Sequence, residues 1–178
     1  MSVIDKTMIH VSPLSALDRV TAKLQAYDLL TLLSPDYPDV DWSGLKCERH
    51  VRLAFHDIVE PMPGLVAPDT ELMQAILDFG RHAARQQELL IHCWAGISRS
   101  SAAAFAIACD RNPGFERDIA LELRRRAPSV TPNRLMVRLT DDLLRRDGRM
   151  MEAIEVIGRG AEAREGEPYR LPLHWPIG

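Results

Sequence analysis

Short apolar runs alternate with helical patterns along most of the chain, and this alternation restricts the possible folds more than any other sequence feature. Strand-like runs occupy residues 8–11, 27–33, 50–55 and 88–92. Helical patterns occupy residues 12–25, 70–79, 100–110, 115–127, 132–146 and 150–157. Neighbouring parallel strands need a long crossover connection, which is usually a helix. The order therefore predicts an α/β fold with a central, mostly parallel sheet flanked by helices.

The length and composition indicate one globular domain followed by a short tail. The chain has 178 residues, of which 46% are hydrophobic, so it can bury a sizeable core. We assign residues 1–160 to this domain. Residues 161–178 contain three prolines and no helical pattern, and we expect them to form an extended C-terminal tail.

Charge and hydropathy exclude several kinds of partner. The formal net charge is −3, so the chain has no general positive field for binding nucleic acid. Its apolar runs are far shorter than the roughly 20 residues that a membrane-spanning helix needs. The first residues carry Asp5 and Lys6 and lack the pattern of a signal peptide. We therefore expect a cytoplasmic protein without a membrane span, whereas its oligomeric state is not visible in the sequence.

The cysteines indicate reduced thiols. The three of them, Cys47, Cys93 and Cys109, are an odd number without the CxxC spacing of zinc sites. Cys47 and Cys109 are therefore expected to be ordinary reduced residues rather than redox partners of Cys93.

Residues 89–101, LLIHCWAGISRSS, lead from an apolar strand through Cys93 and a short loop into a helix. A helix N-terminus offers unpaired N–H groups and the positive end of a dipole, and a tight loop adds further amides. Five residues separate Cys93 from Arg99. This spacing lets the guanidinium bind two phosphate oxygens while the sulfur faces phosphorus. The segment predicts a phosphate-binding loop with Cys93 at its base.

Each polar group of this segment has an expected role. The amides and Arg99 would stabilise a thiolate, which makes Cys93 a nucleophile. Gly96 supplies backbone freedom, and the Ser100 hydroxyl can donate to the sulfur when it becomes a leaving group. The expected phosphate-binding residues are Trp94, Ala95, Gly96, Ile97, Ser98 and Arg99.

The segment HCWAGISRS resembles the HCxxGxxRS signature of the cysteine-dependent protein tyrosine phosphatases. The compact chain is most similar to their dual-specificity branch, because residues 126–144 resemble that branch's segment in which a Pro-Asn pair opens a helix. Here the pair is Pro132 and Asn133. The resemblance spans about residues 8–146 and implies a phosphatase-like catalytic domain that uses no metal and no cofactor.

The resemblance also implies a mechanism. Cys93 attacks the phosphoryl group, Arg99 stabilises the transition state, and water hydrolyses a phosphocysteine intermediate. An aspartic acid on an upstream loop protonates the leaving group. Asp57 is our choice, since it begins a proline-rich loop after the strand at residues 50–55; Glu60 and Asp69 remain rivals.

Two further residues are expected to support the loop. His92 should orient it by hydrogen bonding, with its side chain pointing away from the pocket because successive strand residues face opposite sides. Asn133 is expected either to brace the phosphate loop, as the resemblance implies, or to cap the following helix. Arg124, Arg125 and Arg126 are expected to form a solvated helix face.

The residues of the loop restrict the range of possible substrates only in part. The five residues between Cys93 and Arg99 include no Lys or Arg, which favours phosphotyrosine or phosphoserine/threonine in a protein over highly charged inositol phosphates. Arg52 or Arg134 could still add charge, so nucleotides and other small phosphate esters stay open. The alternatives are a phosphate-binding relative without turnover and a rhodanese-type sulfurtransferase, which would also place a cysteine among amides.

Overall fold

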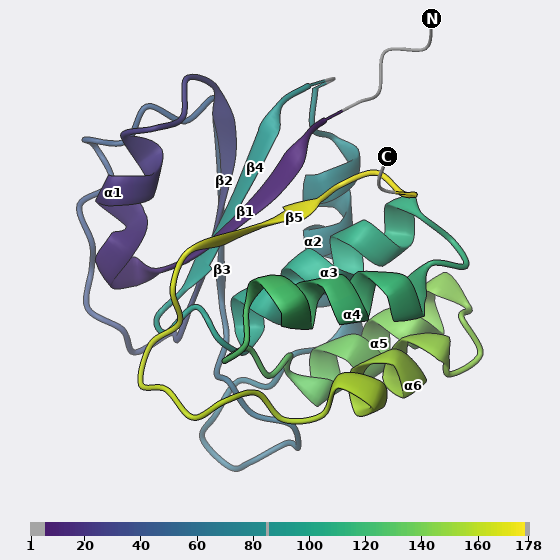
Figure 1. Cartoon of the computed structure of the whole chain (residues 1–178). Coiled ribbons are helices and arrows are strands. Elements are labelled where there is room, and N and C mark those ends of the chain that lie inside the picture. The colour runs from purple at the N-terminus through teal and green to yellow at the C-terminus, as the bar shows by residue number, and fades with distance from the viewer. Residues whose placement is uncertain (1–5, 85, 177–178) are drawn as a thin grey trace, which may run out of the picture.

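The structure, a computed structural model, describes residues 6–84 and 86–176 and contains one five-stranded sheet with helices on both faces (Figure 1). The strands are β1 (Met8–Pro13), β2 (Tyr27–Leu33), β3 (Arg49–Ala54), β4 (Glu88–Cys93) and β5 (Tyr169–Pro172). The helices are a 3-10 turn (Leu14–Ala16), α1 (Leu17–Thr21), α2 (Thr70–Arg81), α3 (Arg99–Arg111), α4 (Glu116–Arg126), α5 (Arg134–Leu144) and α6 (Arg149–Ile157). The predicted α/β class is confirmed.

The strand order β3-β2-β4-β1-β5 places β4, which leads to Cys93, in the middle of the sheet. Strands β1 to β4 pair in parallel, and β5 pairs antiparallel with β1. Ligands of open parallel sheets bind outside the carboxyl ends of the strands. Residues 94–98, predicted to bind phosphate and called the phosphate loop below, follow β4 at this edge, where the sequence places them.

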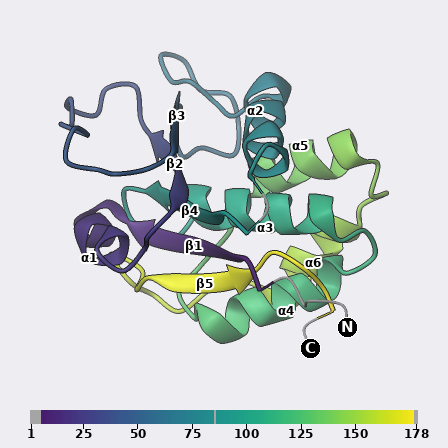
Figure 2. The same ribbon diagram turned by 90° about the horizontal axis from the view of Figure 1, so that it is seen from above.

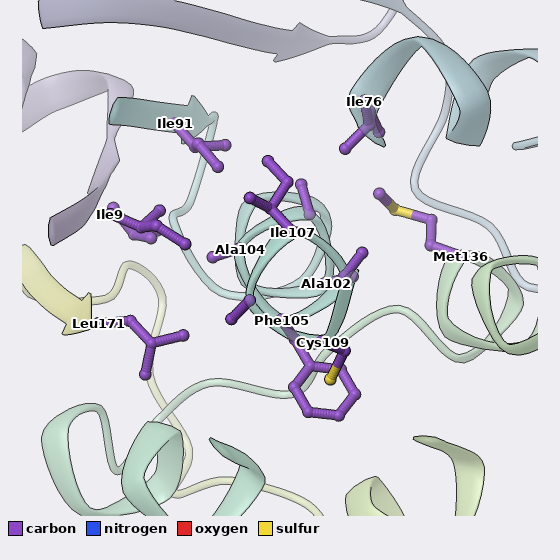
Figure 3. Close-up of a cluster of buried hydrophobic side chains, with 14 of the residues drawn as sticks. Ile9, Ile76, Ile91, Ala102, Ala104, Phe105, Ile107, Cys109, Met136 and Leu171 are labelled. Atoms are coloured by element: carbon purple, nitrogen blue, oxygen red, sulfur yellow. The ribbon is translucent and has the colours of Figure 1, made fainter. Parts of the chain in front are cut away.

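The sheet separates two apolar layers (Figure 2). Helix α1 and the segment 34–48 cover one face, where Leu17, Tyr27, Leu29 and Leu90 pack together. Helices α2 to α6 cover the other face, and α3 runs through the middle of this core (Figure 3). The alanines of α3 let it approach the sheet closely. The N-terminus of α3 is thereby held firmly under the phosphate loop.

Two predicted elements differ from the structure. The helix expected at residues 12–25 is wrong in extent: Ser12 and Pro13 continue β1, because Ser12 pairs with His92 and Pro13 with Cys93. Tertiary pairing overrides the local N-cap pattern there, and only a 3-10 turn and the five residues of α1 remain. The tail assigned to residues 161–178 includes β5, so the sheet extends across the boundary drawn at residue 160. No helix in the described part of the chain is both long enough and apolar enough to cross a bilayer.

Candidate active site

The Cys93 sulfur lies at the base of the phosphate loop and is almost fully buried, with 2% of the residue exposed. It shares a hydrogen bond of 3.1 Å with the Ser100 hydroxyl, from the first turn of α3. The Gly96 N–H donates to the sulfur at 3.2 Å. Two donors available to a thiolate thus meet at this atom, one from a helix N-terminus and one from the loop.

Four of the five carbonyl groups of the phosphate loop are hydrogen-bonded to surrounding segments. Trp94 O accepts from the Leu14 N–H at 3.1 Å, and Ala95 O accepts from the Gly166 N–H at 2.8 Å. Ile97 O accepts from the Thr131 N–H at 3.1 Å, and Ser98 O accepts from the Asn133 N–H at 3.2 Å. In a planar trans peptide the N–H points opposite to the C=O. The loop amides are therefore turned inward, which is the arrangement that holds an anion.

Gly96 is required by both its backbone conformation and its surroundings. Its φ is +68°, in the left-handed region. A Cβ there would lie 2.6 Å from the backbone nitrogen of Pro13. No other residue type fits this position without moving the loop away from β1.

Arg99 is 7% exposed, and its guanidinium is held from one side. Its Nη1 donates to Phe55 O at 2.8 Å and to the Ser34 hydroxyl at 3.2 Å, and the guanidinium carbon lies 5.8 Å from the centre of the Phe55 ring. The Nε group is buried without a hydrogen-bond partner. Because an unpaired buried donor is unfavourable, this N–H is available for an anion bound in the loop.

Asp57 contacts the phosphate loop through its side chain. Its Oδ1 accepts from the Ser98 hydroxyl at 2.8 Å and from Asn133 Nδ2 at 2.8 Å. Asp57 itself is exposed, so its carboxyl group stays in contact with solvent at the rim of the site. The rival Asp69 instead caps α2 by accepting from the Leu72 N–H, and Glu60 is exposed on the same loop as Asp57.

Asn133 combines the two roles that the sequence left open. Its Oδ1 caps α5 by accepting from the Met136 N–H. Its Nδ2 holds Asp57 and also donates to Ile58 O at 3.2 Å. Asn133 therefore connects three segments: the loop that carries Asp57, the phosphate loop and the start of α5.

His92 lies on the other face of the sheet from the helical core that surrounds Cys93. Its Nε2 is 2.7 Å from the Thr31 hydroxyl, which is also 2.8 Å from His50 Nε2. One hydroxyl has one proton, so Thr31 donates to one ring and accepts from the other. Burial lowers the pKa of His92 to about 4. The ring is thus neutral near pH 7 and suits a supporting role.

Several residues of the site carry no recognisable local signal. Ser34 and Phe55, which bond Arg99, are the residues that directly follow β2 and β3, respectively. The position of Ser34 after a predicted parallel strand is a usable clue, because strand ends converge in such sheets. Gly166 has no such clue, since it lies in the proline-rich tail.

The other two cysteines lie away from this chemistry. Cys109 is fully buried in the core near the far end of α3 (Figure 3), and burial raises its thiol pKa. Cys47 is half-buried against the α1 face. All three cysteines are free thiols.

A cavity of about 810 Å³ near the sheet is separate from this site. It lies at the amino ends of β2 and β4 and is lined by residues such as His10, Lys23 and Arg170. The phosphate loop lies at the opposite, carboxyl ends of these strands, so the cavity is not part of the candidate active site.

A scan against protein-family models and a search of curated proteins found no match. Solved structures of similar fold include Tk-PTP in the active form, with a TM-score of 0.53 and 20% identity over 79% of this chain and 92% of that one. DUSP15 is similar with a TM-score of 0.53 and 14% identity over 88% of this chain and 93% of that one. The chain therefore has the fold of the protein tyrosine phosphatases, in the form found in the dual-specificity type.

Proposed function

We propose that the protein is a phosphatase that hydrolyses phosphate monoesters through a phosphocysteine intermediate. The observation that carries the proposal is the Cys93 sulfur at the base of a loop in which four carbonyls are bonded to surrounding segments. This loop leads into the buried Arg99, whose Nε has no hydrogen-bond partner. Inward amides and a guanidinium match the three equatorial oxygens of a phosphoryl group in transfer.

The first step transfers the phosphoryl group to sulfur. The Cys93 thiolate forms the S–P bond while the P–O bond to the leaving group breaks, and the leaving oxygen takes a proton from the Asp57 carboxyl group. Arg99 and the loop amides balance the negative charge of the equatorial oxygens. The contact of Asp57 with Ser98 supports this role, because it holds the carboxyl group at the edge of the loop.

The second step returns the free enzyme. Water forms a new O–P bond while the S–P bond breaks, and Asp57 accepts the proton of that water. The Ser100 hydroxyl, 3.1 Å from the sulfur, stabilises the departing thiolate by donating to it. Inorganic phosphate is the product, and no metal or cofactor enters either step.

Phosphorylated proteins are the substrate class that the surroundings favour. Arg134, which could have added charge to the pocket, pairs with Glu155 at 2.9 Å. The loop that carries Asp57 exposes four apolar side chains: Val59, Met62, Leu65 and Val66. Apolar side chains suit a peptide that flanks phosphotyrosine, phosphoserine or phosphothreonine better than they suit a polyanionic inositol phosphate.

The test measures phosphate release from p-nitrophenyl phosphate by the wild type, Cys93→Ser and Asp57→Asn. We expect no turnover in C93S and a loss of roughly 10²-fold in D57N, whose amide oxygen can still accept from Ser98 and Asn133. Glu60→Gln is the matched control and should keep wild-type turnover, and EDTA should change nothing.

Other results would redirect the assignment. Absence of turnover in folded, reduced wild-type protein would overturn the proposal, and thiosulfate turnover would then identify a sulfurtransferase. If D57N kept full activity while E60Q lost it, the acid role would pass to Glu60. Phosphotyrosine, phosphoserine and phosphothreonine peptides, compared with an inositol polyphosphate, then decide the substrate class.

A further inference from the structure

The C-terminal strap, residues 158–172, passes the outer side of the phosphate loop before it joins the sheet as β5. In Figure 1 it is the yellow-green to yellow segment that leaves α6, runs below the sheet and rises to β5. Between residues 161 and 167, Gly166 is the one buried position. The strap thus inserts a single residue against the loop while its neighbours stay in solvent.

One peptide unit connects this residue to the nucleophile. Ala95 O accepts from the Gly166 N–H at 2.8 Å, and the Gly96 N–H of the same peptide donates to the Cys93 sulfur at 3.2 Å. Because the unit is planar, a rotation that broke one of these bonds would also weaken the other. We infer that Gly166 is a positioning residue for the proposed phosphatase reaction: it holds the Ala95–Gly96 peptide so that its N–H faces the sulfur and the bound phosphoryl group.

The close approach explains why a glycine occupies this position. A Cβ on Gly166 would lie 3.1 Å from Gly96 O, 3.6 Å from Ala95 O and 3.5 Å from Ile97 Cγ1. Two of these three atoms are backbone carbonyl oxygens of the phosphate loop. An added methyl group must therefore push the strap and the loop apart by a few tenths of an ångström, and this stretches the hydrogen bond that orients the peptide.

The strap is anchored before Gly166 to the end of α4 and to the segment that follows it. Arg124 Nη2 donates to Gly158 O at 2.8 Å, and the Ala161 N–H donates to Pro128 O at 2.8 Å. The Gly160 N–H donates to the Thr131 hydroxyl at 3.1 Å, and the Thr131 N–H itself holds Ile97 O. This part of the strap therefore supports the phosphate loop at a second carbonyl.

The strap is also anchored around and after Gly166. Glu165 accepts from the Ser15 hydroxyl at 2.7 Å. Ser15 directly follows Leu14, whose N–H donates to Trp94 O in the phosphate loop. Farther along, β5 pairs with β1, and Arg126 Nη1 donates to Arg170 O at 3.1 Å. Anchors on both sides fix the Gly166 N–H in place, so it can impose an orientation on the loop.

Gly166→Ala is the direct test, and Gly44→Ala is its matched control. Gly44 is exposed, has no atom within 4 Å of an added Cβ and has no positive φ. We expect G166A to lower kcat for p-nitrophenyl phosphate by roughly tenfold, less than the 10²- to 10³-fold loss of a removed oxyanion donor. The affinity for vanadate, measured by calorimetry, should fall by a similar factor, and G44A should match the wild type in both.

A second variant covers the case in which G166A does not fold. Glu165→Gly loosens the strap beside Gly166 and removes the bond to Ser15 without adding any atom that could clash. A two- to fivefold loss of kcat and of vanadate affinity is expected, with a thermal midpoint close to that of the wild type. A strap that only stabilises the fold would change the midpoint and leave both active-site measurements as in G44A.

The outcomes separate this inference from the proposed function. If the wild type turns over the ester and folded G166A and E165G both behave as G44A does, the positioning role is overturned. A wild type that binds vanadate without turnover refutes the proposed function alone, since vanadate affinity still compares the variants. A wild-type protein that neither turns over the ester nor binds vanadate overturns both the proposed function and the positioning role of Gly166.

Discussion

At the scale of the residue, His92 makes the free energy of unfolding depend on pH. Burial lowers its pKa from the ordinary value of 6.5 to about 4. Between these values the unfolded chain binds a proton that the folded protein does not, so stability is complete above pH 6.5 and is lost as the pH falls toward 4. The whole effect is about 3 kcal/mol. Urea unfolding at pH 7 and pH 4.5 should show much of this loss in the wild type.

His92→Gln is the variant that isolates the contribution of His92 to the pH dependence of the unfolding free energy. Gln places an amide nitrogen near the position of Nε2 and can keep the bond to Thr31, but it does not titrate. The loss of stability between pH 7 and pH 4.5 should be smaller in H92Q than in the wild type. His50, whose pKa burial also lowers, is retained in both proteins. A pH dependence in H92Q as large as that of the wild type would rule out the titration of His92.

The same scale shows which site residues a sequence can reveal. Cys93, Gly96, Arg99 and Ser100 are visible because one strand, one loop and one helix turn bring them together within eight residues. Gly166 and the other partners of the loop come from distant segments that only the tertiary fold places there. Asp57 is intermediate: the chain order predicts a loop at the correct edge of the sheet, but the contact with Ser98 needs the structure.

At the scale of the element, the end of α4 is held by one arginine of the triplet that was expected to form a solvated face. That expectation is wrong for Arg124, whose Nη1 donates to Pro128 O at 2.7 Å and to Val130 O at 2.8 Å. Its Nη2 also reaches Gly158 O. Residue periodicity cannot show this, because the acceptors are backbone carbonyls beyond the helix.

Arg124→Met should therefore cost about 2 kcal/mol of unfolding free energy, since it removes these three charged hydrogen bonds, of which the one to Val130 O is half-buried, and keeps the apolar stem. Arg125→Met is the matched control on the same helix. Arg125 pairs with Glu122 and its side chain is 67% exposed, so its loss should stay under about 1 kcal/mol. Equal losses in urea unfolding would show that Arg124 is a surface residue after all.

At the scale of the whole molecule, the C-terminal segment completes the core. Tyr169, Leu171 and Leu173 are buried in the cluster that also contains α3, and Figure 3 shows Leu171 beside Ile9. The strand β5 also covers the edge of β1, which would otherwise expose unpaired backbone groups. The sequence did not indicate a strand here because four residues among prolines give too short an apolar alternation, and pairing with β1 supplies the missing stabilisation.

Leu171→Ala measures how far the fold depends on this segment. Leu171 is 0% exposed, and replacing a fully buried leucine by alanine costs about 2–4 kcal/mol through lost burial and the cavity that remains. Leu121→Ala is the matched control, because Leu121 is 46% exposed on α4 and should lose less than about 1 kcal/mol. If both variants unfolded at the same urea concentration, residues 161–172 would be an appended tail, and the domain would be complete at residue 160. A large difference would mean that the strap which reaches the phosphate loop ends in a strand that the core itself requires.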